Sequence, residues 1–156
     1  MADAVETKEA PKKIKGRQYI WGTGRRKSAV ARVRNRQDTI GLALRRGRQY
    51  LRETSASNGD FTYPGQGGLI AWSRILHDQE VLVVLNTHGG EDQGAKVTVD
   101  ASLYPHGSQM SVLYNSEWSD AELKDPPQNQ TLSVTVLDGR STVQVDLPPA
   151  GMMILA

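Results

Sequence analysis

SVTVLDGRSTVQVDL, residues 133–147, contains the pattern that decides the fold class. Apolar and polar residues alternate on both sides of Asp138-Gly139, as they do in strands with one buried and one solvated face. Asp and Gly tolerate the positive φ angles that a tight primed turn requires. The stretch therefore predicts an antiparallel β-hairpin.

Short strands are also predicted along the rest of the chain, at a spacing of roughly ten residues. VLVVLN, residues 81–86, is apolar on both faces, which indicates a central strand. The breaks between strands are rich in Gly, Pro, Asn and Ser, the composition of turns. We expect an all-β fold, an antiparallel Greek-key β-sandwich of about eight strands. The expected strands cover residues 44–53, 68–76, 81–87, 96–100, 110–115, 131–137, 142–146 and 152–155.

Charge divides the chain into two unlike parts. Residues 1–52 hold 15 Lys and Arg and 4 acids, a net charge of +11, whereas residues 53–156 hold 4 basic residues and 13 acids, a net charge of −9. Such asymmetry is typical of a polyanion-binding arm on an acidic body. We expect a disordered tail at 1–18, a basic strand at 19–36, a joint at 37–43 and the sandwich at 44–156.

The basic strand contains YIWGTGRRKSAVARVR, residues 19–34, with five cations and no acid. A phosphate-binding loop of the nucleotide-binding type requires Gly directly before its Lys, where Arg26 stands, so this type is not expected. Contact with a sugar–phosphate backbone fits better, and a solvated basic strand is the alternative. The candidate RNA-binding residues are Arg25, Arg26, Lys27, Arg32 and Arg34.

This stretch resembles the opening strand of the ninth protein of the bacterial small ribosomal subunit. That family begins with an aromatic residue, Gly-Thr-Gly-Arg-Arg-Lys, Ser or Thr, and then Ala-Arg-Val. The resemblance covers residues 19–34 and implies contact with ribosomal RNA by Arg25, Arg26, Lys27 and Arg32. The family continues into an αβ domain and a long basic tail, whereas this sequence continues with strands.

Residues 42–156 resemble a different family, the C-terminal all-β domain of the α-amylases, glycoside hydrolase family thirteen. The resemblance is carried by EVLVVLN, which ends in Asn86, and by the closing Pro-Pro-Ala-Gly turn at 148–151. It implies a noncatalytic module, because in that family the catalytic carboxylates lie on a (β/α)₈ barrel. Such a barrel takes about 250 residues, and this chain has no room for one.

No catalytic, metal or cofactor site is predicted. The acids fall mostly in expected turns, where solvation is their expected role; they are Asp60, Asp78, Glu80, Glu91, Asp92, Asp120, Asp125 and Asp138. His77, His88 and His106 also fall in turns, without the spacing of metal ligands. Cysteine is absent, which excludes thiolate ligands and Cys nucleophiles.

Two tryptophans could contact carbohydrate weakly. Trp118 lies in an expected loop, where an exposed ring could stack on a sugar or contact a partner. Trp72 has apolar neighbours, which favour core or interface packing over sugar contact.

Together these features predict a chimera. We expect a carbohydrate-associated accessory module that is not an enzyme and carries an RNA-binding-like basic arm; the alternative is a small-subunit ribosomal protein that binds ribosomal RNA. The predicted partners are ribosomal RNA through the arm, a weakly bound glucan, and a second copy through an orphaned docking face. We expect no membrane partner and a cytoplasmic location, because no apolar run of about 18 residues and no secretory signal are found.

Overall fold

The computed structural model describes residues 39–56, 60–64 and 67–156. The expected tail at 1–18, the basic strand at 19–36 and residues 37–38 of the joint lie outside the described residues. The elements are α1 (Thr39–Arg46), β1 (Arg48–Arg52), β2 (Thr54–Ser55), β3 (Leu69–Leu76), β4 (Gln79–Asn86), β5 (Gln93–Thr98), β6 (Gln109–Asn115), α2 (Asp120–Lys124), β7 (Thr131–Leu137), β8 (Arg140–Leu147) and β9 (Met152–Leu155).

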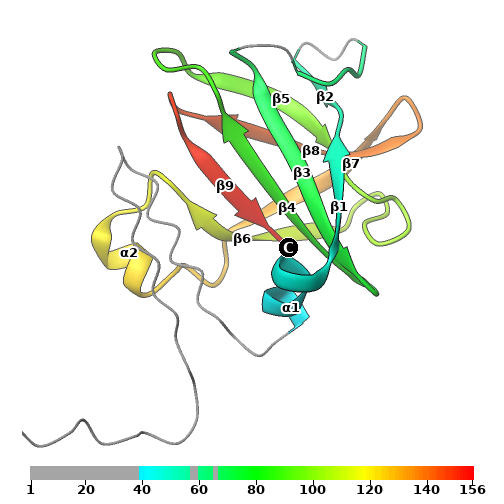
Figure 1. Cartoon of the computed structure of the whole chain (residues 1–156), viewed down its shortest axis with the longest axis horizontal. Helices are drawn as coiled ribbons and strands as arrows, with labels where there is room; N and C mark the ends of the chain where they lie inside the picture. The colour runs from blue at the N-terminus through cyan, green and yellow to red at the C-terminus, as the bar shows by residue number, and fades with distance from the viewer. Residues whose placement is uncertain (1–38, 57–59, 65–66) are drawn as a thin grey trace, which may run out of the picture.

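The strands form one antiparallel sheet in the order β1-β3-β4-β9-β6-β7-β8-β5-β2, which confirms the all-β class (Figure 1). The sheet folds on itself where β6 and β7 pair, so that β1, β3, β4, β9 and β6 face β7, β8, β5 and β2. Because β5 lies beside β8, the order β6-β7-β8-β5 is that of a Greek key.

The main apolar core lies between the two halves of the sheet and combines side chains from both. Burial of this surface is the main force that holds the halves together. The buried members are Leu69, Ala71, Leu82, Val84, Ala95, Val97, Val99, Met110, Val112, Trp118, Val134, Val143, Val145, Leu147, Met153 and Leu155.

Strand β4 is central, as VLVVLN predicts. It lies between β3 and β9, and its residues are buried on both faces. Leu82 and Val84 belong to the core between the halves, whereas Val81 and Val83 belong to a second apolar cluster on the other face of the sheet.

Helix α1 packs on that second cluster through Ala43, with Ile40 and Leu44 beside it. These residues recur at the three- and four-residue spacing of one helix face. The expected strand at 44–53 is therefore wrong for its first three residues, which finish α1. Strand β1 begins after Gly47, and the helix crosses the boundary expected between the joint and the sandwich.

The β7–β8 hairpin is confirmed. Asp138 has φ 51° and Gly139 has φ 73°, so both take the left-handed conformation of a primed turn. Helix α2 was not expected in its loop. Its local cause is a capping box, in which the Ser119 side chain accepts from the Glu122 amide and the Glu122 carboxylate accepts from the Ser119 amide.

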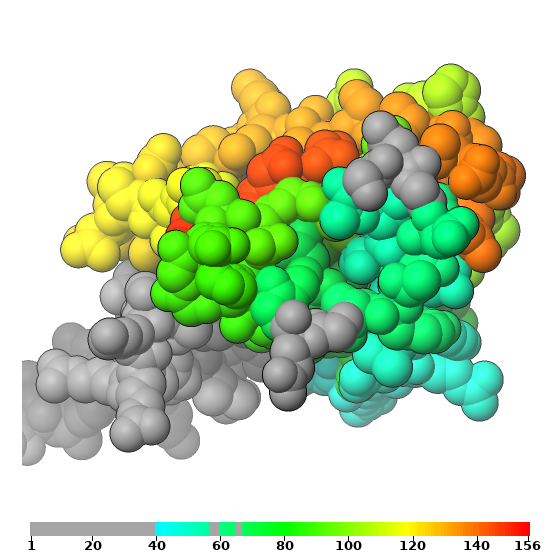
Figure 2. All heavy atoms as spheres, turned by 90° about the horizontal axis from the view of Figure 1, so that it is seen from above, coloured from blue at the N-terminus to red at the C-terminus, as the bar shows by residue number. Residues whose placement is uncertain are grey.

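Helix α2 lies at one end of the molecule and the β7–β8 turn lies at the opposite end, as both views show (Figures 1 and 2). Neither helix in the described part of the chain is long and apolar enough to cross a membrane.

We predict that Gly139→Ala destabilises the fold by about 1 kcal/mol, because a side chain is strained at positive φ. Gly89→Ala is the control, since Gly89 also has open space around it but no positive φ. Its free energy of unfolding should stay close to that of the wild type. Urea denaturation measures the free energy of unfolding of both variants. An equal decrease for Gly139→Ala and Gly89→Ala would contradict the role of the positive φ angle at Gly139.

Candidate functional site

A buried carboxylate is the most unusual polar feature of the described residues. Glu80 was expected in a solvated turn, but it lies in β4 with an exposed fraction of 0%. A buried charge must be paired and hydrogen-bonded, or the fold is strongly destabilised. The groups around Glu80 therefore have to meet this requirement.

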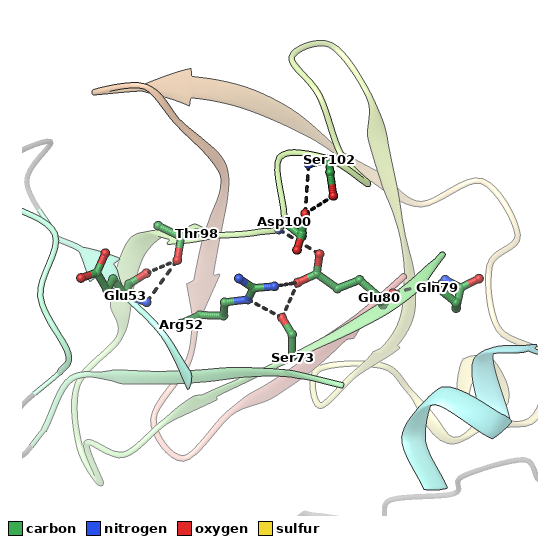
Figure 3. Close-up of polar contacts among 8 residues, drawn as sticks. All are labelled: Arg52, Glu53, Ser73, Gln79, Glu80, Thr98, Asp100 and Ser102. Atoms are coloured by element: carbon green, nitrogen blue, oxygen red, sulfur yellow. Dashed lines mark hydrogen bonds and ion pairs between the residues drawn. The ribbon is translucent and has the colours of Figure 1, made fainter. Parts of the chain in front are cut away.

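Three segments supply the partners of Glu80 (Figure 3). Arg52, the last residue of β1, donates from Nη2 to Glu80 Oε1 at 2.6 Å. Arg52 Nε also donates to Ser73 Oγ at 2.7 Å, and Ser73 Oγ in turn donates to Glu80 Oε1. The backbone amide of Asp100, after β5, donates to Glu80 Oε2 at 2.9 Å. Both carboxylate oxygens are thus occupied.

Asp100 and Tyr104 extend this network. Ser102 donates to Asp100 Oδ1 from its hydroxyl at 2.5 Å and from its amide at 3.0 Å. These bonds, the hydroxyl bond first, lower the pKa of Asp100, and the positive charge of Arg52 acts in the same direction. Burial raises the pKa of Tyr104, and the negative charge of Glu80 adds to this rise.

The arrangement around Glu80 is suited to holding segments together rather than to catalysis. A general acid or base needs an oxygen within reach of a substrate, and the Glu80 oxygens are occupied by Arg52, Ser73 and Asp100. In the described ranges, no group of three or more His, Asp or Glu side chains could hold a metal ion.

A second polar centre lies at the other end of β4. Asn86 is 1% exposed, and its Nδ2 group donates to the carbonyl oxygens of Leu147 at 3.2 Å, Pro148 at 2.8 Å and Glu91 at 3.0 Å. Its Oδ1 accepts from the amide of His88 at 2.9 Å. The Asn86 side chain therefore joins the end of β4 to the Pro-Pro-Ala-Gly turn.

Of the residues predicted to bind RNA or carbohydrate, the structure describes the two tryptophans and not the basic residues. Arg25, Arg26, Lys27, Arg32 and Arg34 lie outside the described residues. Trp118 lies in a loop as expected, but its ring is only 9% exposed, belongs to the core and donates from Nε1 to Gln130 Oε1 at 3.0 Å. A ring buried in this way has little open face for the weak sugar or partner contact for which Trp118 is a candidate. Trp72 is half-buried against the second apolar cluster, in line with the packing favoured for it.

No protein-family model matches this chain, and no curated protein matches it.

Sequence reasoning missed the network of Arg52, Ser73, Glu80 and Asp100. One signal was present, because Glu80 directly precedes a strand that is apolar on both faces. The identity of its partners had no local signal, since Arg52 lies 28 positions away from Glu80.

We predict that Arg52→Met destabilises the fold by about 3 kcal/mol, because it leaves the buried Glu80 without its cation. The double variant Arg52→Met/Glu80→Met should recover part of this loss, since neither charge remains. Arg48→Met is the control, as Arg48 is exposed on the same strand. Chemical denaturation measures all three, and an equal loss for Arg52→Met and Arg48→Met would contradict the role of the ion pair.

We also predict a pH-dependent effect of Ser102→Ala. The pKa of Asp100 is lowered in the folded state, so its contribution to stability is present above its unfolded pKa and is lost as pH falls through the folded pKa. The destabilisation by Ser102→Ala should therefore be largest near neutral pH and shrink below about pH 4. Urea denaturation at a series of pH values measures it.

Ser108→Ala is the matched control, because Ser108 Oγ donates to the Pro105 carbonyl rather than to an acid. Its effect should not vary with pH. An effect of Ser102→Ala that stays constant across the series would show that the hydroxyl does not act through Asp100.

Proposed function

We propose that the sandwich is a noncatalytic accessory module of the α-amylase type, associated with carbohydrate. The observation that carries this proposal is the contact between Asn86 and the Pro-Pro-Ala-Gly turn. These are the two features on which the resemblance to the α-amylase C-terminal domain depends. Asn86 and Pro148 lie 62 positions apart, yet the Asn86 side-chain amide joins them.

The environment of Glu80 supports a role without catalysis. Hydrolysis of a glycosidic bond needs two carboxyl groups that face each other across the sugar, at about 5 to 10 Å. Glu80 is closed to any ligand by its own partners and by complete burial. Asp100 is likewise bonded to Ser102. The engagement of these two acids within the fold supports a binding role rather than a catalytic one.

Binding to glucan should be weak. Sugar contact by aromatic residues needs an open ring face, and Trp118 is almost fully buried while Trp72 is half-buried. A glucan would therefore meet only part of one of the two candidate rings. We therefore expect the weak affinity for glucan that is typical of an open surface site, and not the higher affinity of an enclosed pocket.

A second candidate function is binding of ribosomal RNA as a small-subunit ribosomal protein. The observation that favours it is the segregation of charge, with +11 in residues 1–52 and −9 in residues 53–156. A cationic segment of this kind neutralises phosphates and releases counterions. The candidate contacts at residues 25–34 belong to that segment.

The two functions are separated by the effect of salt and by deletion of residues 1–36. We predict weak retardation of the chain by glycogen in affinity electrophoresis, unchanged by salt and by the deletion. Binding to ribosomal RNA should fall by about tenfold or more between about 50 and about 200 mM salt, and should be lost on deletion. Starch incubated with the chain should release no reducing sugar.

Three outcomes of these experiments would count against the accessory-module function. Release of reducing sugar above a protein-free blank, with an intact α-amylase as positive control, would contradict the noncatalytic module. Glycogen binding that disappears on deletion of residues 1–36 would assign the sugar contact to the arm instead. Tight RNA binding without glycogen binding would favour the second candidate.

A further inference from the structure

Strand β1 is an exposed edge of the sheet that the structure describes. It stands at one end of the strand order, beside β3, as Figure 1 shows. Its residues 48–51 are all exposed. Alternate backbone N–H and C=O groups of an antiparallel edge strand point away from the neighbouring strand, where another strand can pair with them.

The outer face of the sheet carries an apolar row that ends at this edge. Leu51 is 61% exposed, and its Cα partner on β3 is the half-buried Trp72. The row continues through Val83 of β4 to Ile154 of β9, both of which are buried. Leu51 is therefore the exposed end of a continuous apolar surface rather than an isolated side chain, and such a surface favours association.

The opposite face of β1 carries an aromatic ring and a cation. Tyr50 and Arg52 lie two positions apart and so share this face, which is also the face of Ser73. The Arg52 Cζ atom lies 5.9 Å from the centroid of the Tyr50 ring, and Tyr50 is 40% exposed. The two faces of β1 therefore differ in the residues that they would offer to a strand paired at the edge.

Three registers about a two-fold axis overlap most of β1 with a second copy of itself. A register centred on Gln49 pairs two polar amides and leaves Leu51 outside the overlap. A register centred on Tyr50 places Arg48 opposite Arg52, and like charges directly opposite each other destabilise a sheet. A register centred on Leu51 pairs the two leucines and places each Arg52 opposite Tyr50 of the second copy. Charge complementarity and apolar contact therefore both favour Leu51 as the centre.

We propose that two copies of this chain associate through the edges of their β1 strands, in antiparallel register about a two-fold axis at Leu51. The row of Trp72 and Leu51 in one copy then continues into Leu51 and Trp72 of the second copy. Burial of this joined apolar row drives the association, and backbone pairing of residues 50–52 gives it direction. The proposal goes beyond the accessory-module function and does not depend on it.

The association should be weak and should stop at the dimer. An overlap of residues 50–52 is short, and small interfaces are typical of transient complexes. A two-fold contact uses the β1 edge of both copies, so it closes on itself. Sedimentation velocity of the full-length chain at rising concentration should show monomer converting to dimer. Species larger than the dimer would overturn the proposal, and so would a monomer that persists at about 1 mM, which populates complexes with a Kd in the millimolar range.

Cysteine cross-linking tests the register directly, since the chain contains no cysteine of its own. In the proposed register the two Leu51 Cα atoms lie about 4.5 to 5.5 Å apart, within the range that a disulfide bridges. Leu51→Cys should therefore form a covalent dimer as its main product under mild oxidation. Tyr50→Cys should form little, because each Tyr50 lies opposite Arg52. A covalent dimer that forms mainly in Tyr50→Cys would overturn the register.

Val136→Cys is the matched control for cross-linking, because Val136 is an apolar residue of β7 that is 50% exposed. Equal cross-linking of Leu51→Cys and Val136→Cys would show random collision and overturn the proposal. Reaction with a maleimide in dilute solution tests whether the edge is open in the single chain. Much slower reaction of Leu51→Cys than of Val136→Cys would show that another part of the same chain covers the edge, which also overturns the proposal.

Leu51→Lys tests the apolar contact without a covalent bond. The affinity between copies should fall by at least about tenfold, because two ammonium groups would face each other across the axis. Val136→Lys is the control and should leave association unchanged. Both positions are exposed, so both variants should keep the free energy of unfolding of the wild type in urea denaturation. Equal effects of the two variants on association would overturn the proposal.

Discussion

The ion pair between Glu80 and Arg52 is the constraint on which the arrangement of the N-terminal elements depends. A carboxylate with no exposed surface is tolerated only with a full set of donors. Those donors come from β1, β3 and the segment after β5, so the three segments are fixed relative to one another. Among the strands that the structure describes, β1 is an exposed edge strand, and its partner there is β3. Through Gly47, which closely approaches the carbonyl oxygens of Ala43 and Ile75, the position of β1 also determines where α1 lies.

Strand β4 has a buried polar side chain near each end, Glu80 near its start and Asn86 at its last residue. Glu80, Leu82, Val84 and Asn86 alternate with residues of the opposite face, so the same face is polar at its ends and apolar between them. Burial of Leu82 and Val84 drives the halves of the sheet together but is not directional. The hydrogen bonds of Glu80 and Asn86 are directional, and they determine which loops meet each end of the strand.

The features predictable from sequence are those with a local signal. The turn at Asp138-Gly139 and the central strand at residues 81–86 follow from turn chemistry and hydrophobic pattern alone. The burial of Trp118 and the partners of Glu80 could not be predicted, because they depend on residues distant in the chain, such as Arg52. Residues 44–46 were misassigned to a strand because Leu44 and Tyr50 are an even number of positions apart, as residues on one face of a strand are. Residues 19–34, for which contact with RNA was predicted, lie outside the described residues.

The central claim is that the Glu80 network holds β1 to the sandwich, and amide hydrogen exchange measured by mass spectrometry tests it most directly. The wild type is compared with Glu80→Gln, and Glu117→Gln, at an exposed acid, is the control. The account predicts faster exchange in Glu80→Gln for peptides that cover residues 44–53, with unchanged protection in the β7–β8 hairpin. Unchanged exchange at 44–53, or an equal increase in every strand, would contradict it.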